Sequence, residues 1–152
     1  MPSIDLTVET EIAAAPADVA AVMFDPQREP EWMSAIKNVE LVDAALQPGA
    51  RVKRTASFMG KEIGWTTEVE AVHFPHVLTL KIADGPFTGT VSYQIQRSAG
   101  GSVVRIHNQG RTTKFGFLPA SLIEGPMRSA LNADLARLKA LVERRESGES
   151  VI

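Results

Sequence analysis

Residues 119–145 have the sequence PASLIEGPMRSALNADLARLKALVERR. Apolar residues recur along this stretch at intervals of three and four, which places them on one face of an α-helix. They are Ile123, Met127, Leu131, Leu135, Leu138 and Val142. About 26 residues at about 1.5 Å each form a rod roughly 40 Å long, enough to cross seven strands that lie about 4.8 Å apart. The stretch therefore predicts a long amphipathic helix whose leucine-rich face needs an apolar surface to cover it.

Gly125 and Pro126 lie one turn into this predicted helix. Proline has no amide hydrogen to donate within a helix, so we expect a kink or a break there, with the uninterrupted helix beginning near Pro126. Beyond the helix, residues 147–152 are predicted to form a flexible tail. Residues 1–146 are predicted to form a single domain, as expected from the length of the chain.

The surface that covers the helix is predicted upstream, in segments where apolar and polar residues alternate. These segments are residues 4–12, 36–43, 51–58, 61–74, 76–82, 88–96 and 102–115. Turns such as Asp84-Gly85-Pro86 and Ala99-Gly100-Gly101 separate the later segments, and short connections of this kind are typical of an antiparallel sheet. We therefore expect seven antiparallel strands.

Between the first two strands, residues 16–24 (PADVAAVMF) predict a short helix that begins at Pro16 and ends before Asp25-Pro26. The chain is thus predicted to be an α+β protein with the order strand, short helices, six strands, long helix. A curved sheet wrapped around the last helix buries both apolar faces.

The composition excludes several classes of partner. Sixteen basic and eighteen acidic residues give a net charge of -2, so we expect no binding to nucleic acid. The chain has no cysteine, which excludes disulfides and thiolate chemistry and fits a reducing compartment. No signal-peptide pattern and no apolar run of about 20 residues is found. We expect a soluble, cytoplasmic protein that is a monomer or a homodimer.

Two stretches carry a resemblance to a known family: IAAAPADVAAVMFDPQREPEWMSAIKNVELV, which begins at Ile12, and LNADLARLKALVE, which begins at Leu131. With the order of elements, they resemble the START-related (SRPBCC) superfamily, and within it the polyketide cyclase/dehydrase-like group of bacterial proteins. The resemblance covers about residues 3–143. It implies a helix-grip fold with two short helices after the first strand, and a cavity between sheet and last helix. Members bind lipids, sterols, polyketides or plant hormones, and a minority are cyclases or aromatases.

Strand alternation predicts which side chains line this cavity. Residues 61–74 place Ile63, Trp65, Thr67, Val69 and Ala71 on one face, which is predicted to point into the cavity. A mostly apolar pocket with a few polar groups is typical of a small-molecule site. The predicted ligand-binding residues are Trp32, Arg54, Phe58, Trp65, Thr67, Leu80, Tyr93, Asn108, Met127 and Leu131.

Two of these residues have alternative interpretations. Arg54 falls on the inward row, where it orients a ligand or stabilises an oxyanion, pairs with a structural carboxylate, or is turned outward by a local twist. In the stretch FDPQREPEWMSAI (residues 24–36), the charges are expected to face water while Trp32 and Met33 turn inward. Trp32 then either plugs the end of the cavity or contacts its contents.

Catalytic and cofactor motifs are scarce. The chain has no GxSxG, HExxH, GxxxxGK[ST] or GxGxxG pattern, so we expect no cofactor. His73 and His76 flank a proline turn, which favours a solvated turn over a metal site. A general acid or base would come from Tyr93, Glu124, Asp134 or a water, although Glu124 and Asp134 are expected to be solvated helix residues.

The sequence therefore favours a protein that binds a small hydrophobic or amphipathic molecule, lipid or polyketide-like. The alternative is a polyketide aromatase, cyclase or dehydratase in the same cavity, with Arg54 polarising a carbonyl and Tyr93 or a water moving the proton.

Overall fold

The computed structural model describes residues 3–43, 45–58, 60–82, 84–85, 87–112 and 120–146. The predicted tail at residues 147–152 lies outside this part of the chain. The elements in chain order are β1 (Ser3–Ile12), α1 (Pro16–Met23), a 3-10 turn (Pro26–Arg28), α2 (Glu29–Trp32), β2 (Ile36–Leu41), β3 (Arg51–Phe58), β4 (Lys61–His73), β5 (Val77–Ile82), β6 (Phe87–Ser98), β7 (Gly101–Thr112) and α3 (Ala120–Glu146).

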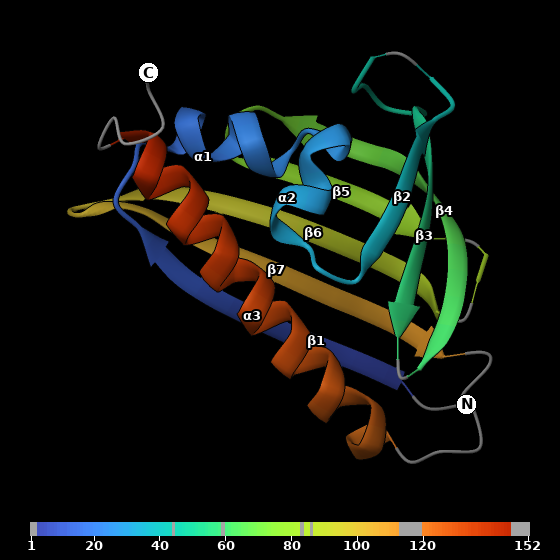
Figure 1. The fold of residues 1–152 in the computed structure, drawn as a ribbon. Coiled ribbons are helices and arrows are strands. Elements are labelled where there is room, and N and C mark those ends of the chain that lie inside the picture. The colour runs from blue at the N-terminus through green and yellow to red at the C-terminus, as the bar shows by residue number, and fades with distance from the viewer. Residues whose placement is uncertain are drawn as a thin grey trace.

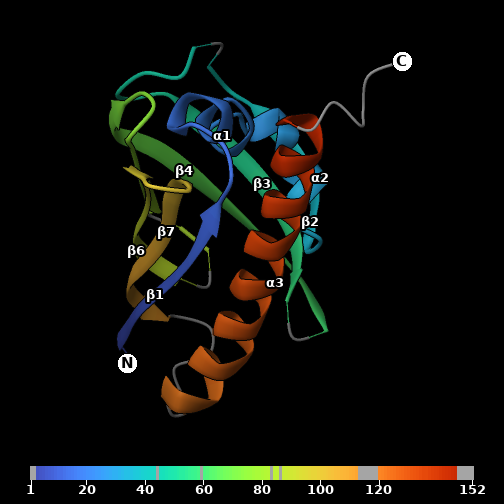
Figure 2. The ribbon, with the colours of Figure 1, turned by 90° about the vertical axis from the view of Figure 1, so that its left-hand side faces the viewer.

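The strands form one seven-stranded sheet in the order β1-β7-β6-β5-β4-β3-β2. Each neighbouring pair is antiparallel. Figure 1 shows α3 running along β1 over the inner side of the sheet, with α1 and α2 at one end. In Figure 2, the edge strands β1 and β2 lie on opposite sides of α3. This arrangement is the predicted helix-grip fold: the sheet curls around the last helix.

The helix α3 is continuous from Ala120 to Glu146 and contains Pro126, so the predicted break is wrong. Pro126 and Leu122, the residue four positions earlier, are both exposed. Water can therefore hydrate the carbonyl that loses its helical hydrogen bond. Among the described residues, no helix is long and apolar enough to cross a membrane.

The strand β4 contains an irregularity that the sequence analysis missed. Its register with β5 shifts between Val69 and Ala71, so that Val72 lies opposite Leu78 and packs against the core. Ala71 was predicted to face inward, and that prediction is wrong because a bulge reverses the alternation.

The strands β6 and β7 approach each other closely at a pair of glycines. Gly89 lies opposite Gly110 and has a φ of 151°. A Cβ at Gly110 would overlap the backbone oxygen of Thr88, and one at Gly89 would overlap that of Gln109. The two strands therefore require glycine at both positions.

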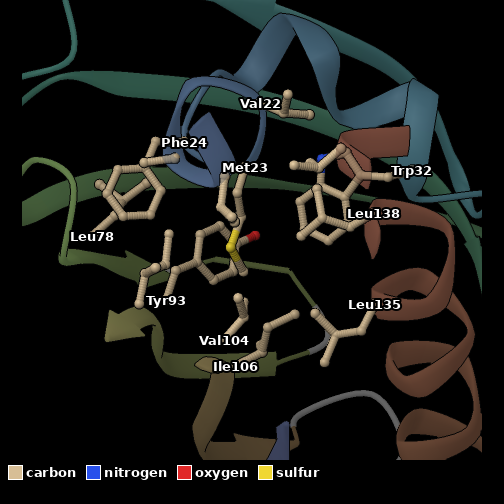
Figure 3. Packing of buried hydrophobic residues seen from close by; sticks show 14 of the residues in the cluster. Val22, Met23, Phe24, Trp32, Leu78, Tyr93, Val104, Ile106, Leu135 and Leu138 are labelled. Atoms are coloured by element: carbon tan, nitrogen blue, oxygen red, sulfur yellow. The ribbon is translucent and has the colours of Figure 1, made fainter. Parts of the chain in front are cut away.

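The core lies at the end of the sheet that α1 and α2 cover. Figure 3 shows Met23 from α1, Trp32 from α2, Tyr93 from β6, and Leu135 and Leu138 from α3 meeting there. All five are buried. Because they come from helices and sheet alike, this cluster holds the short helices and α3 against the sheet.

Candidate functional site

A cavity of about 220 Å³ lies between the inner face of the sheet and α3. The sheet contributes side chains from β2 to β7, and α3 contributes Ile123, Met127, Ala130, Leu131 and Asp134. The wall is mostly apolar. Of the side chains predicted to bind a ligand, those that line this cavity are Arg54, Trp65, Thr67, Leu80, Tyr93, Asn108, Met127 and Leu131.

The other two predicted residues are placed differently. Trp32 is fully buried in the core and does not belong to the lining. Its ring packs edge-on against Tyr93, with centroids 6.2 Å apart, so it supports a lining residue from behind. This position agrees with the plug interpretation. Phe58 ends β3, and its side chain lies outside the described part of the structure.

Arg54 forms a buried ion pair with Glu29. Its Nε and Nη2 donate hydrogen bonds to the two carboxylate oxygens of Glu29, each at 2.7 Å, and its Nη1 donates to the hydroxyl of Thr67 at 2.5 Å. Arg54 is 6% exposed and Glu29 is 2% exposed. Of the three interpretations of Arg54, the structure shows pairing with a carboxylate.

This pairing sets the charge state of Arg54. Burial lowers the pKa of its guanidinium, but the hydrogen bonds and negative charge of Glu29 raise it more, so that the pKa is raised overall. Arg54 therefore stays positive and contributes a fixed, already bonded charge to the cavity wall. Glu29 was expected to face water with the other charges of its segment. That expectation is wrong, because Arg54 holds it inside.

Tyr93 lies beside this pair in the cavity wall. Burial raises the pKa of its hydroxyl, the charge of Glu29 raises it further, and the charge of Arg54 opposes the shift. The phenol is therefore protonated at neutral pH, and it can donate a hydrogen bond but is a poor general base.

Asp134 lines the cavity from α3 and is 7% exposed, so the prediction of a solvated residue is wrong. Burial raises the pKa of its carboxyl, although the charge and hydrogen bond of Arg137 and the amide of Ser34 oppose the shift. Arg137 bonds to Asp134 and donates to the Trp32 carbonyl at 2.9 Å and the Ser34 hydroxyl at 3.0 Å. These bonds tie α3 to the end of α2 and to Ser34, which follows it.

Asn108 and Thr112 add polar atoms on the β7 wall. Asn108 is 8% exposed and Thr112 is 2% exposed, and both line the cavity. The amide nitrogen of Asn108 lies 3.8 Å from the sulfur of Met127. Neither Oδ1 of Asn108 nor Oγ1 of Thr112 has a hydrogen-bond partner among the described residues.

No metal centre is found in the part of the chain that the structure describes, where no three His, Asp or Glu side chains gather to hold an ion. His76 instead hydrogen-bonds the Ile95 carbonyl at 2.8 Å through Nδ1. His107 pairs with Asp5 at 2.7 Å on the outer face.

The lining residues that the sequence analysis did not place in the cavity include Glu29, Asp134 and Thr112. A signal existed for the first two. An inward Arg54 requires a carboxylate partner, and Asp134 lies seven residues after Met127, on the same helix face. Thr112 follows the alternation of β7 from Asn108, so its position could also have been found.

The fold and the cavity define a protein of the helix-grip type. A family model described as polyketide cyclase / dehydrase and lipid transport matches residues 3–143, and the chain belongs to this family. The predicted resemblance is therefore confirmed. A comparison with curated protein sequences finds no match.

Solved structures with the same fold have low sequence identity to this chain. The di-domain ARO/CYC StfQ from the steffimycin biosynthetic pathway has a TM-score of 0.78 at 12% identity, over 96% of this chain and 53% of that one. The protein TTHA0849 from Thermus thermophilus has a TM-score of 0.76 at 20% identity, over 93% and 97%. Major latex-like protein 151 from Panax ginseng has a TM-score of 0.72 at 16% identity, over 91% and 96%.

Proposed function

We propose that this protein binds a small hydrophobic or amphipathic molecule, lipid or polyketide-like, in the cavity between the sheet and α3. The observation that carries the proposal is the cavity itself. It has a mostly apolar wall in which a few polar groups, those of Arg54, Tyr93 and Asn108, face a common space. This combination is typical of small-molecule sites, and the family includes lipid transport in its description.

The size of the cavity limits the ligand. Its volume of about 220 Å³ is below the roughly 300–1,000 Å³ of pockets that hold drug-sized ligands. A compact aromatic molecule or a short acyl chain fits this volume better than a sterol does.

Binding is tested by isothermal titration calorimetry with apolar aromatic molecules and short-chain lipids, after native mass spectrometry of the purified protein. We expect micromolar affinity for at least one class, weakened by Trp65→Ala, because Trp65 lines the cavity. Leu141→Ala, a change on α3 outside the lining, is the matched control. If no molecule travels with the protein and none of either class binds, the proposal fails.

A second candidate function is a polyketide aromatase, cyclase or dehydratase. It is favoured by the juxtaposition of a fixed positive charge, Arg54, and a protonated phenol, Tyr93, on one cavity wall. Arg54 would stabilise negative charge developing on a substrate carbonyl, and the Tyr93 hydroxyl would donate a proton.

Catalysis is tested by following the products of a poly-β-keto substrate chain with the protein and with Tyr93→Phe. The phenylalanine keeps the ring that packs against Trp32 and removes only the hydroxyl. An enzyme loses turnover in this variant while its substrate affinity changes little. An unchanged product distribution in the presence of the wild-type protein contradicts the catalytic role and leaves the binding role standing.

A further inference from the structure

We propose that Asn108 is the anchor for a neutral hydroxyl group of the ligand. The cavity would thus select uncharged alcohols or phenols over carboxylic acids such as free fatty acids. This inference rests on the proposed binding function, because it names the chemistry of the molecule that the cavity holds.

The first step is the unpartnered oxygen of Asn108. The side chain is 8% exposed and lines the cavity, yet its Oδ1 has no hydrogen-bond partner among the described residues. Buried polar groups are nearly always paired, and leaving one unpaired costs free energy. Oδ1 itself is buried, so a ligand reaches it when the amide group turns about its last side-chain bond toward the cavity, and the pairing then recovers that free energy.

The second step is the position of Asn108 within the cavity. It lies opposite Val91 on β6, which lies opposite Leu80 on β5, and both neighbours line the cavity. Met127 of α3 faces it from the other side, with its sulfur 3.8 Å from the amide nitrogen. Asn108 is therefore a polar group set among apolar lining side chains from sheet and helix, where it can fix the orientation of an apolar molecule.

The third step is the chemistry of the partner. A carbonyl-type oxygen accepts hydrogen bonds, so it selects a ligand group that donates one. Ketones and ionised carboxylates have no hydrogen to donate. A hydroxyl group both donates and accepts, so it can pair with the amide of Asn108 whether that amide presents its oxygen or its NH2 group.

The fourth step is the charge of the wall. Among the described lining residues the charged side chains are Arg54, Glu29 and Asp134. The guanidinium of Arg54 is already bonded to Glu29 and Thr67, and Asp134 is bonded to Arg137. An anionic ligand would meet two carboxyl groups and one guanidinium whose charge is already balanced by Glu29. Burying an ion without a free counter-charge is costly, so the wall favours a neutral ligand.

The test uses three naphthalene derivatives that carry a methyl, hydroxyl or carboxylate group at the same ring position. Their binding to the full-length protein is measured by isothermal titration calorimetry at neutral pH. We expect the hydroxyl compound to bind about tenfold more tightly than the methyl compound, and the carboxylate to bind more weakly than either. Tightest binding by the carboxylate, or equal binding of the hydroxyl and methyl compounds, overturns the proposal.

Variants assign the preference to a residue. In Asn108→Leu, which keeps a similar shape without polar atoms, the hydroxyl and methyl compounds should bind within about twofold of each other. Asn108→Ala must give the same result if the leucine variant does not fold. In Leu141→Ala, a change on α3 outside the lining, the tenfold preference should persist. Thr112→Val, which removes the other unpaired polar atom of the β7 wall, tests the competing assignment. A preference lost only in Thr112→Val overturns the assignment to Asn108.

The outcomes separate this inference from the function on which it rests. If the methyl compound binds but the hydroxyl gives no advantage, the protein binds apolar molecules and the role of Asn108 is refuted. If none of the three compounds binds, the inference fails, and the wider ligand set described above decides the proposed function on its own.

Discussion

Glu29 and Arg54 are two opposite charges that the fold removes from water together. Each is more than nine-tenths buried, and their bidentate contact at 2.7 Å compensates for the lost hydration. The pair joins α2 to the sheet in the wall of the cavity. Removing one partner leaves the other charge buried alone, which is far more costly than removing both.

We therefore predict that Arg54→Leu destabilises the protein by about 3–5 kcal/mol, and that Arg54→Leu combined with Glu29→Leu costs less than either single change. Urea denaturation of the two single variants and the double variant measures the coupling. Additive losses in the double variant would show that the pair is not coupled.

Trp32 stabilises the wall without reaching the cavity. It is fully buried, packs on Tyr93, and its backbone carbonyl accepts a hydrogen bond from Arg137.

We predict that Trp32→Ala lowers the free energy of unfolding by about 3–5 kcal/mol. The milder Trp32→Phe should leave the affinity for an apolar probe within about threefold of the wild-type value. The matched change Trp65→Phe, on the lining, should lower affinity more. A large loss of affinity in Trp32→Phe at unchanged stability would instead make Trp32 a ligand contact.

Asp134 gives the protein a measurable pH dependence. Its pKa in the folded state is raised above the ordinary value of 3.8, chiefly by burial. At a pH between the ordinary pKa and the raised pKa of the folded state, the Asp134 carboxyl is protonated in the folded protein and ionised in the unfolded chain. Raising the pH through this range therefore favours unfolding. We predict that the stability difference between wild type and Asp134→Asn falls as the pH rises from 3.8 and then levels off. Urea denaturation of both proteins across this range measures the difference, and a difference that grows with pH contradicts the shift.

The elements follow from local patterns except where tertiary packing overrides them. The seven strands lie close to the segments that alternation and turn residues predicted, and α1 lies where Pro16 and helical spacing predicted it. The second short helix, α2, was implied only by the family resemblance. The bulge after Val69 was not predictable, because period-two alternation continues through it and only pairing with β5 reveals the extra residue. The prediction at Pro126 was wrong because a local signal was given too much weight. A local rule was applied at an exposed position, where water and the rest of a long, packed helix compensate for one lost bond.

Substitutions at the glycine pair of β6 and β7, Gly89 and Gly110, test how closely the two backbones approach each other. A methyl group at Gly110 would overlap the backbone of Thr88, so we predict that Gly110→Ala destabilises the protein by about 1–3 kcal/mol. Gly100, in the turn between the same strands, has no atom within 4 Å of the corresponding position. Gly100→Ala should therefore change the stability by less than about 0.5 kcal/mol. Thermal and urea unfolding compare the two variants, and equal effects would contradict the steric explanation.

At the scale of the whole molecule, the sheet and α3 enclose a cavity instead of a fully packed core. The helix-grip fold was predictable because the apolar stripe of α3 and the alternating strands have one economical arrangement. Many lining side chains were predictable from strand alternation alone. The sequence indicated that an inward Arg54 needs a carboxylate partner, but it did not identify Glu29, 25 residues away, because that choice depends on how α2 is placed over the sheet. The volume of the cavity was not predictable either, since it depends on the distance at which α3 is held.

Unfilled space lowers the free energy of unfolding. A cavity of about 220 Å³ therefore costs stability, which is expected if the cavity serves to bind a ligand. Leu131 lines the cavity, whereas Leu141, on the same helix, packs against the core outside it. We predict that Leu131→Trp abolishes binding of an apolar probe while leaving stability unchanged or raising it by up to about 1 kcal/mol, because the indole fills empty volume. In Leu141→Trp the same side chain meets occupied space, and stability should fall by about 1–3 kcal/mol. Urea denaturation and probe titration of both variants test this contrast. Equal destabilisation by the two changes would mean that the space beside Leu131 closes in solution, and the binding function would lose its structural basis.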